Sequence, residues 1–510
     1  MATSKINRIL IANRSEIASR IQFTCKKLGI KTVSICAPED QTLPFVYQAD
    51  QNYLLEKNGT ASYLDAEKII KIAMQAKVDA IHPGYGFFSE NAAFAQKVID
   101  AGLIWIGPTP KSIKLMANKI EARKVLEKID LPLVPGIYLS STQKEEGKRF
   151  AQKIGYPVLL KNPLGGGGKA IKKVKNAADF DNAFDATLAE AKKLTGSNQI
   201  LLEKCLENAR HIEIQVAGDG KNFIHLYERE CSIQRRHQKI IEETPCNFVE
   251  QKTLQKIHKT AIDIAKTIKY QNIGTVEFLV TQAQDFYFLE MNTRLQVEHS
   301  ITELITGIDL VELQIKLAQK AKLPIQQKEI CKKNHSIECR IYAEDPENNF
   351  LPATGKITHL QLPNGPFLRH DHNLQVDFQV THFFDPMLSK LTCWGKNRDD
   401  AIKNMLASLE QFKIEGVKTN INFLKSILNS QEFLTGNIHT QLLNNPSPRW
   451  LRITSNLIYF KKISDPAYQS VDVQQKDIAF IAATLFKQLF KQQKEQKACP
   501  LNNWKRQQWN

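Results

Sequence analysis

The segment FYFLEMNTRLQVEHS, residues 286–300, begins as an apolar strand and then places a polar residue at every second position. These polar residues are Glu290, Asn292, Arg294, Gln296 and Glu298. A period of two puts all their side chains on one face if the backbone stays extended. Carboxylate and amide oxygens are the ligands that hard divalent cations prefer, so metal binding is the first chemistry that this face indicates.

A second carboxylate belongs to this face because an earlier strand is predicted to pair with the segment. The runs GTVEFLV (274–280) and FYFLEM (286–291) are joined by TQAQD, which is a hairpin pattern. Such a loop places Glu277 opposite Glu290 or within one residue of it. Two carboxylates about 4 Å apart repel by roughly 4 kcal/mol at an effective dielectric of about 20. A divalent cation, Mg²⁺ or Mn²⁺, held by Glu277, Glu290 and Asn292 would remove this repulsion; an edge strand with solvated carboxylates is the alternative.

Two further segments have the composition of anion-binding sites. The glycine run 165–168 lies between strand-like segments and follows Lys161, so backbone N–H groups there could approach phosphate oxygens. The run lacks the Gly-Lys-Ser/Thr that opens the helix of a P-loop, and a flexible linker or a tight hairpin is the alternative. The basic run ECSIQRRHQK, residues 230–239, is either a solvated face or part of a site for an anionic substrate.

The N-terminal part of the chain alternates between predicted strands and helices. RILIAN, SEIASRIQFTCKKLG and KTVSIC read as strand, helix and strand, and similar units follow as far as LIWIG. This pattern predicts a doubly wound parallel sheet. Its first turn, ANRSE, lacks Gly-x-Gly-x-x-Gly, so dinucleotide binding is not indicated. A helix from about Pro110 to Lys128 then leads to the proline-bracketed linker LPLVPG.

The expected domains follow from these boundaries. Residues 1–115 form an N-terminal α/β domain, residues 130–206 a small domain around the glycine run, and residues 116–129 with 207–446 a larger α+β part. Beyond them, apolar residues at helical spacing predict a helical C-terminal extension, residues 447–510. An uninterrupted strand would spread the polar groups of 290–298 over roughly 26 Å, so we expect the chain to leave the sheet near Thr293.

The composition excludes several classes of protein. With 510 residues, 42% hydrophobic and 24% charged, the chain has the balance of a soluble globular protein of several domains. No run approaches the roughly 18 to 20 apolar residues of a membrane helix. Nine scattered cysteines without Cys-x-x-Cys favour a reducing compartment, and we expect the cytoplasm. The net charge of +16 comes without long basic runs interleaved with aromatics, so no nucleic-acid partner is expected.

The chain also contains, in order, the motifs IANRSEIASR, IHPGYGFFSEN, GYPVLLK with GGGGK, EKCLENARHIEIQV, RECSIQRRHQKIIEE, GTVEFL, EMNTRLQVEH, ECRIYAEDP, FLPATGKI and KTNINFL. They cover about Ile6 to Thr440. In type and order these motifs resemble the biotin carboxylase subunit or domain of biotin-dependent carboxylases, members of the ATP-grasp superfamily. The resemblance implies an ATP-grasp unit with a mobile lid and a C-terminal biotin-carboxylase domain after the N-terminal sheet.

The resemblance implies a reaction in two steps. ATP and bicarbonate form carboxyphosphate with release of ADP, and the carboxyl group then passes to N1′ of biotin. No methionine adjoins a lysine, so the Met-Lys-Met biotin acceptor is absent, and biotin is expected on a separate carrier protein or domain. A carboxyltransferase partner and a homodimer are also implied. The final acyl acceptor is left open.

The resemblance further implies a role for each matching residue. Nucleotide binding is implied for Lys119, Lys161, Gly165, Gly166, Gly167, Gly168, Glu203, Lys204, Leu206, His211, Gln234 and His237. Mg²⁺ coordination is implied for Glu277, Glu290 and Asn292. Binding of bicarbonate or biotin is implied for Lys239, Arg294, Gln296, Val297, Arg340, Tyr85 and Gly86. The implied catalytic residues are Lys239, Arg294, Glu298 as the general base, and Arg340 as the cation that stabilises the biotin enolate.

Departures from the family pattern leave these residues intact. The lid has Ala170 where glycine is usual, and Ser300 replaces a usual proline. Two alternatives remain: another ATP-grasp ligase, or a non-catalytic scaffold that binds nucleotide. Arg340 and Tyr85 argue against the first alternative, and the intact set of Lys239, Arg294 and Glu298 argues against the second. We therefore expect an active enzyme.

Overall fold

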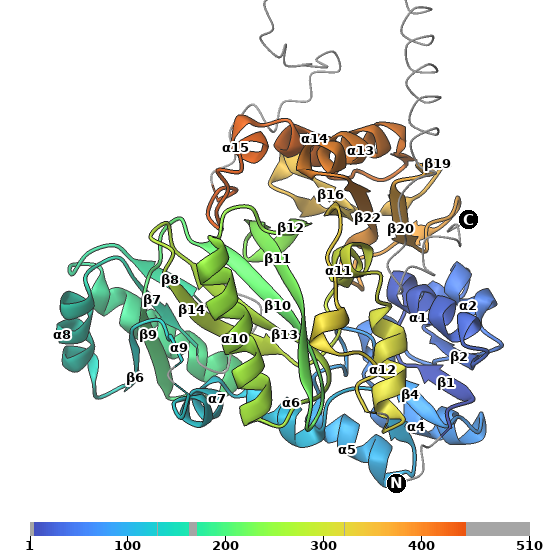
Figure 1. Cartoon of the computed structure of the whole chain (residues 1–510), viewed down its shortest axis with the longest axis horizontal. Helices are drawn as coiled ribbons and strands as arrows, with labels where there is room; N and C mark the ends of the chain where they lie inside the picture. The colour runs from blue at the N-terminus through green and yellow to red at the C-terminus, as the bar shows by residue number, and fades with distance from the viewer. Residues whose placement is uncertain (1–4, 130, 163–170, 321, 445–510) are drawn as a thin grey trace, which may run out of the picture. The chain divides into compact units, whose positions relative to one another are not determined.

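The computed structural model describes residues 5–444 apart from 130, 163–170 and 321 (Figure 1). The predicted extension, residues 447–510, and the glycine run 165–168 lie outside the described residues. Among those described, no helix combines the length and the apolar character that a membrane crossing requires.

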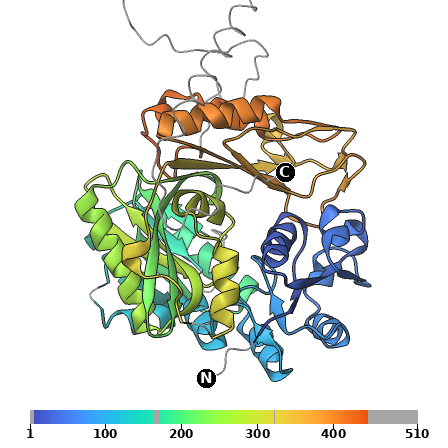
Figure 2. The ribbon, with the colours of Figure 1, turned by 45° about the vertical axis from the view of Figure 1, so that its right-hand side comes forward.

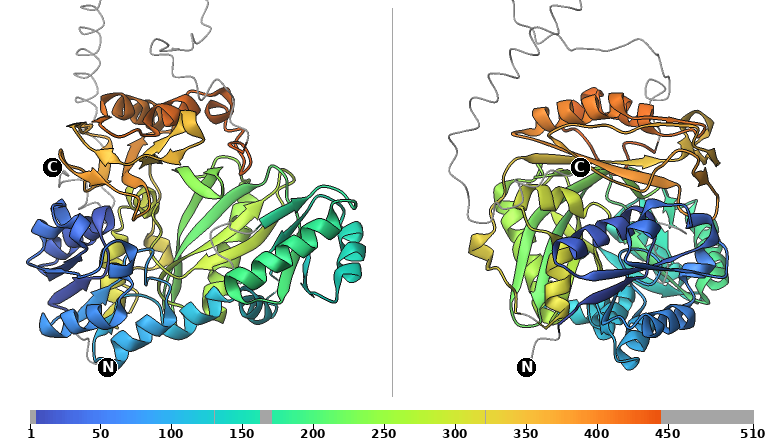
Figure 3. Two further views of the ribbon diagram at one scale, coloured as in Figure 1. Left: turned by 180° about the vertical axis from the view of Figure 1, so that it is seen from behind. Right: turned by 90° about the vertical axis from the view of Figure 1, so that its right-hand side faces the viewer.

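A parallel sheet forms the N-terminal part of the chain, as the alternating pattern predicts. Its strand order is β3 (Gln51–Leu54), β2 (Lys31–Cys36), β1 (Arg8–Ile11), β4 (Ala80–His82) and β5 (Ile104–Trp105). Side chains of β1 alternate between two cores, because Ile9 and Ile11 pack with α1 (Ser15–Lys27) while Leu10 packs with α4 (Ala66–Gln75) and α5 (Ala92–Asp100). The sheet therefore has helices on both faces, and the doubly wound fold is confirmed (Figure 3).

The predicted helix from Pro110 to Lys128 is wrong in its length, because the structure divides it in two. Helix α6 (Pro110–Ala117) ends at Asn118, whose backbone is extended, and α7 (Lys119–Leu126) follows. The Asn118 side chain accepts a hydrogen bond from the backbone N–H of Glu121 at 3.2 Å. An asparagine that caps a new helix in this way competes with continuing the old one.

A four-stranded antiparallel sheet follows, with a core of its own. Its order is β6 (Gly136–Ser140), β9 (Gln199–Lys204), β7 (Val158–Lys161) and β8 (Ile171–Val174). Helices α8 (Lys144–Ile154) and α9 (Phe180–Thr195) pack against it through residues such as Ala151, Phe180 and Phe184. The two strands predicted on either side of the glycine run are thus present and paired.

The larger α+β part contains an eight-stranded antiparallel sheet. Its order is β14 (Phe286–Asn292), β13 (Gln271–Val280), β10 (Arg210–Asp219), β11 (Phe223–Arg235), β12 (Gln238–Thr244), β15 (His335–Tyr342), β22 (Met387–Gly395) and β20 (Leu368–His372). Helix α10 (Gln251–Thr267) packs on the strands at the β14 end, and α13 (Arg398–Gln411) and α14 (Ile421–Leu428) pack at the other end (Figure 2).

The shorter elements of the whole described chain are α2 (Pro44–Gln48), α3 (Thr60–Tyr63), β16 (Glu344–Asp345), β17 (Leu351–Pro352), β18 (Gly355–Lys356), β19 (His359–Gln361), β21 (Gln379–Val380), β23 (Lys413–Glu415) and α15 (Gln431–Leu434).

The predicted hairpin lies at one edge of this sheet. Strands β13 and β14 are antiparallel, and Glu277 pairs directly with Glu290. Strand β14 ends at Asn292, and the chain turns through residues 293–298 into α11 (His299–Thr306) and then α12 (Leu310–Ala318). Both the opposition of the two carboxylates and the departure from the sheet near Thr293 are confirmed.

The glycine of GTVEFLV allows the end of β14 to approach β13 closely. A Cβ on Gly274 would collide with the Tyr270 hydroxyl and would lie 3.0 Å from the backbone oxygen of Asn292. We expect Gly274→Ala to lower the free energy of unfolding by about 1–3 kcal/mol, the usual cost of overpacking. Urea unfolding followed by circular dichroism would measure it, with Gly365→Ala as the control, since no atom lies within 4 Å of a Cβ there. Equal midpoints for the two variants would contradict the prediction.

Candidate active site

The sequence-predicted residues gather around a cleft of about 1080 Å³, which is large enough for a nucleotide. The cleft is lined by the loop after β4, the four-stranded sheet and the strands β10 to β15. Those of the predicted site residues that line it are Tyr85, Gly86, Lys161, Glu203, Lys204, Leu206, His211, Gln234, His237, Lys239, Glu277, Glu290, Asn292, Arg294, Gln296, Val297 and Arg340. Glu298 is fully buried behind the wall of the cleft. The side chain of Lys119 lies outside what the structure describes.

The ammonium group of Lys239 contacts three carboxylates. Its Nζ lies 3.0 Å from Glu277 Oε1 and 2.7 Å from Glu298 Oε1, and it also bonds Glu213 Oε2. Burial alone would lower the pKa of Lys239, but these carboxylates raise it well above its usual value. Because an ammonium group has three N–H donors, every one of them is engaged.

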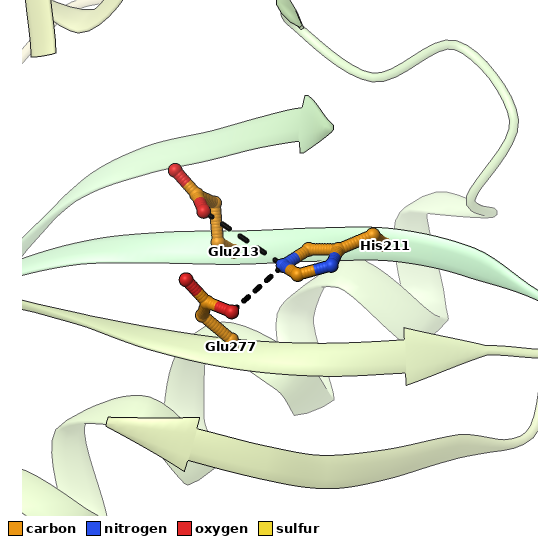
Figure 4. Close-up of side chains that lie close together, drawn as sticks. All are labelled: His211, Glu213 and Glu277. Carbon is orange, nitrogen blue, oxygen red and sulfur yellow. Dashed lines mark ion pairs between the residues drawn. The ribbon is translucent and has the colours of Figure 1, made fainter. Parts of the chain in front are cut away.

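Glu277 is contacted by three further residues, one histidine and two amides. His211 Nε2 lies 3.0 Å from its Oε2, while the amides of Asn292 and Gln296 donate to its Oε1 at 2.7 and 2.9 Å. Figure 4 shows His211 directed at both Glu277 and Glu213, from which its Nε2 is 3.9 Å distant. Although burial opposes it, Lys239 and then His211 hold the pKa of Glu277 well below its usual range. Glu277 is therefore ionised at neutral pH.

The oxygen donors predicted for a metal ion lie on two neighbouring strands. Glu277 of β13 faces Glu290 of β14, and Asn292 follows on the same strand. Two carboxylates and an amide oxygen form a donor set that suits Mg²⁺. The residues present therefore fit the ion that the sequence predicts.

Arg294 points into the cleft beside these carboxylates. Its guanidinium group bonds Glu90 Oε2 at 2.9 Å, Gln296 Oε1 at 3.0 Å and Asn292 Oδ1 at 3.2 Å. Glu90 also accepts the backbone N–H of Thr293 at 3.1 Å, so a loop of the N-terminal sheet fixes the point where the chain leaves β14. The side chain of Arg294 is 20% exposed, which leaves a planar cation available to an anion in the cleft.

Glu298 lies between two cations. Its Oε1 accepts from Lys239, and its Oε2 accepts from Arg340 at 2.8 Å. Burial favours the neutral acid, but Lys239 and Arg340 together hold the pKa of Glu298 well below its usual value. The Nε of Arg340 donates to Glu242 at 2.6 Å, and burial raises the pKa of Glu242 to about 8. Glu298 is thus an ionised carboxylate with two cations beside it, in a position from which a proton acceptor can act.

The predicted phosphate-binding lysine lies on β7, in the four-stranded sheet. Lys161 Nζ bonds Glu203 Oε2 at 2.7 Å, and Arg123 lies 3.3 Å from the other oxygen of the same carboxylate. Lys204 donates to the backbone carbonyl of Gly155 at 2.8 Å. His237 lies in the turn between β11 and β12, and burial, with Lys161 nearby, lowers the pKa of His237. Lys161, Arg123, Lys204 and Lys173 therefore place positive charge at this end of the cleft.

Several residues of the site were missed by the sequence reasoning. Glu213 follows His211 by two residues in HIEIQV, so the period of two that revealed residues 290–298 could also have found it. Glu90 and Glu242 have no comparable signal, since each meets its arginine only in the folded chain. The same is true of Thr440, Gln441 and Asn444, which line the cleft from the C-terminal side of the described chain.

Known protein families match the chain in three consecutive ranges. Residues 5–113 match the biotin carboxylase N-terminal domain, residues 118–326 the ATP-binding domain of the carbamoyl-phosphate synthase L chain, and residues 338–445 the biotin carboxylase C-terminal domain. Together these ranges contain the predicted site residues.

Relatives and solved structures agree with these matches. Biotin carboxylase 2 of Bacillus subtilis (strain 168) is 45% identical over 86% of this chain and 98% of its own. The mitochondrial methylcrotonoyl-CoA carboxylase subunit alpha of Arabidopsis thaliana is 42% identical over 86% of this chain and 60% of its own.

Among solved structures, the biotin carboxylase domain dimer of Hydrogenobacter thermophilus 2-oxoglutarate carboxylase, in complex with MgADP, ADP and bicarbonate, is 39% identical. It covers 88% of this chain and 100% of its own, with a TM-score of 0.84. A biotin carboxylase–βγ-ATP complex from Campylobacter jejuni is 41% identical over 87% and 99% of the two chains, with a TM-score of 0.83. The chain belongs to the biotin carboxylase family.

Proposed function

We propose that this enzyme catalyses the ATP-dependent carboxylation of biotin with bicarbonate. The observation that carries the proposal is the position of Lys239, whose ammonium group joins the metal-side carboxylate Glu277 to the buried carboxylate Glu298. Arg294 offers its guanidinium group to the same cleft. Two cations and a carboxylate base in one place suit an anion that must lose a proton before it attacks a phosphate.

In the first step, bicarbonate would bind between Lys239 and Arg294, with Gln296 and Val297 beside it. All three N–H groups of Lys239 already contact carboxylates, so bicarbonate must replace one of these contacts. Glu298 would take the bicarbonate proton as the contact with Lys239 loosens and the proton affinity of Glu298 rises. A bicarbonate oxygen then bonds the γ-phosphorus of ATP while the bond to ADP breaks, which gives carboxyphosphate.

In the second step, the bond between the carboxyl carbon and the phosphate oxygen of carboxyphosphate would break, N1′ of biotin would bond that carbon, and the released phosphate would take the N1′ proton. Arg340, Tyr85 and Gly86 line the same cleft, and they would hold the biotin ureido ring. Arg340 is bound to both Glu242 and Glu298, so its guanidinium group is held in place as negative charge develops on the ring. Lys161, Glu203, Lys204, Leu206, His211, Gln234 and His237, with Lys119 and Gly165 to Gly168, would hold the nucleotide.

Mg²⁺ would be held by Glu277, Glu290 and Asn292, and when bound it neutralises charge on the phosphate oxygens of ATP. We expect Glu290→Gln to raise the Mg²⁺ concentration that gives half-maximal activity by at least about 10-fold, because one charged ligand is lost. Titration of ATP hydrolysis with MgCl₂ at constant ionic strength would measure this. Glu415→Gln, which changes an exposed carboxylate on β23, is the control; identical titrations for both variants would contradict the metal assignment.

ATP hydrolysis distinguishes this proposal from its alternatives. We expect hydrolysis that requires bicarbonate and is stimulated by free biotin. Hydrolysis that depends on bicarbonate but never responds to biotin would favour another ATP-grasp ligase. A chain that binds ATP without hydrolysing it would be a scaffold.

Biotin would reach the site on a carrier protein or domain, and a carboxyltransferase would use the product. We also propose a homodimer in the cytoplasm; the related Hydrogenobacter thermophilus domain forms a dimer, and the free thiols of the described cysteines suit a reducing compartment. Residues 130–206 are proposed as the lid domain, since the four-stranded sheet has its own core. Light scattering and mass spectrometry of co-purifying proteins would test the dimer and the partners.

A further inference from the structure

A buried ion network lies directly behind the turn that follows β14. Its members are Arg20, Glu303, Asp309, Arg369, Asp371 and Lys390, three cations and three carboxylates that link α1, α11, α12, β20 and β22. The side chain of Lys390 is 1% exposed. A lysine is almost never buried so completely without a specific partner for its charge.

The nearest partner of Lys390 is a backbone group of the proposed bicarbonate pocket. Its Nζ donates to the carbonyl oxygen of Val297 at 2.6 Å, whereas Asp371 Oδ2 lies farther away at 3.3 Å. Both oxygens of Asp371 already accept from Arg369, at 3.0 and 2.8 Å. The ammonium group is therefore directed at the turn, and the ion network neutralises its charge from behind.

Among the described residues, the side chains that donate to the two preceding carbonyls of the turn come from nearby in sequence. The Leu295 carbonyl accepts from Arg294 at 3.3 Å, and the Gln296 carbonyl accepts from His299 Nδ1 at 2.8 Å. Both donors belong to the turn or to its immediate end. The third carbonyl in this row, that of Val297, accepts instead from Lys390 of strand β22. This hydrogen bond connects the turn to the eight-stranded sheet.

We propose that Lys390 is a positioning residue for bicarbonate activation: its buried ammonium group fixes the Val297 carbonyl and so sets the place of Val297 and Glu298. This inference rests on the proposed function of those residues. Lys390 itself contacts no substrate. Since Glu298 is the next residue after the held carbonyl, loss of this bond would let the base and the anion pocket shift together, while the nucleotide end of the cleft is unaffected.

Lys390→Met tests the proposal because it keeps the length of the side chain and removes the donor. We expect kcat/KM for bicarbonate to fall by about 10- to 100-fold, since misplacement by about 1 Å of groups at the chemistry costs rate on this scale. The KM for ATP should change less than about 3-fold, because the partners of Lys161, Glu203 and Lys204 lie outside the turn. Lys390→Gln, which retains an N–H donor, should recover part of the loss.

Thr24→Val is the matched control. Thr24 belongs to the same network, where it donates to Asp309 at 2.7 Å and accepts from Arg20 at 2.5 Å, and it is fully buried. Its side-chain hydrogen bonds join it to Arg20 and Asp309 and not to the turn, so its replacement should leave kcat/KM for bicarbonate within about 2-fold of the wild-type value. Thermal unfolding of all variants would show how much each change costs the fold.

The outcomes separate the inference from the proposed function. A change in the KM for ATP as large as the fall in kcat/KM for bicarbonate, or an equal fall in Thr24→Val, would show that Lys390 only stabilises the fold. If Lys390→Met does not fold, Lys390→Gln and Thr24→Val give the comparison: a selective bicarbonate defect in the first alone supports the inference, and equal kinetics overturn it. Wild-type enzyme without bicarbonate-dependent hydrolysis would overturn the proposed function, and this inference with it.

Discussion

Glu298→Gln is expected to lower kcat for bicarbonate-dependent ATP hydrolysis by about 10²- to 10⁴-fold, the usual contribution of a general base. Glutamine keeps the size of the side chain, and its one amide oxygen can still accept a hydrogen bond from Lys239 or from Arg340, which bond different oxygens of Glu298. It cannot take a proton from bicarbonate. The expected signature is therefore a large loss in kcat with a much smaller change in the KM for ATP, measured by steady-state kinetics of phosphate release.

The control for this variant is Glu338→Gln. Glu338 is also fully buried and lies on β15, the strand that carries Arg340. Its carboxylate, however, accepts hydrogen bonds from the hydroxyl groups of Ser300 and Thr392. Loss of that carboxylate should cost less than about 10-fold in kcat. Glu298→Gln with activity within 10-fold of wild type would show that the proton goes elsewhere.

Lys239→Met is expected to abolish bicarbonate-dependent hydrolysis and to lower the free energy of unfolding by about 3–5 kcal/mol at pH 7.5. The variant leaves Glu213, Glu277 and Glu298 buried without their shared cation. Each retains at least one other partner: Arg229 for Glu213, His211 for Glu277 and Arg340 for Glu298. The stability loss should therefore be large without preventing folding, and urea unfolding would measure it.

The free energy of unfolding of Lys239→Met should also respond to pH in the opposite direction to that of wild type. In wild type, the depressed pKa values of Glu277 and Glu298 contribute stability above the unfolded pKa of about 4.3, and that stability is lost as the pH falls further. Without Lys239, we expect burial and mutual repulsion to raise these pKa values in the folded variant above the unfolded value. The folded variant then binds more protons than the unfolded chain, so it should gain stability relative to wild type as the pH falls from 7.5 toward 5.

Lys204→Met is the control for the pH response. Lys204 lines the same cleft, but its ammonium group donates to the backbone carbonyls of Gly155 and Tyr156. Its removal leaves no buried carboxylate without a partner, so the difference in the free energy of unfolding from wild type should not change with pH. A Lys239→Met variant that shows the same flat response would contradict the account of the three-carboxylate contact.

Local sequence patterns predicted those parts of the fold in which neighbours along the chain decide the structure. The hairpin length set Glu277 against Glu290, and the alternation in 290–298 identified side chains that line one cleft, with Glu298 just behind it. The same local reasoning failed at Asn118, where an apolar pattern continues through a residue whose side chain caps a second helix. A hydrophobic period alone cannot report this capping bond.

Other features depend on contacts between segments far apart in sequence. The ion pair of Arg294 with Glu90 joins residues 204 positions apart, and that of Arg340 with Glu242 joins residues 98 positions apart. Lys390 meets the Val297 carbonyl across 93 positions. No propensity or spacing encodes such partners, because they depend on the packing of whole sheets. The family resemblance supplied the roles of the site residues, and the structure supplied their distances.

The most direct test of bicarbonate activation follows oxygen atoms. When bicarbonate labelled with ¹⁸O is supplied with ATP and biotin, a bicarbonate oxygen forms the bond to phosphorus and remains there when carboxyphosphate gives up its carboxyl group. We predict that the phosphate released in the first turnovers carries one labelled oxygen, detected by mass spectrometry. Phosphate without label, released while ATP is consumed and biotin is carboxylated, would contradict the mechanism.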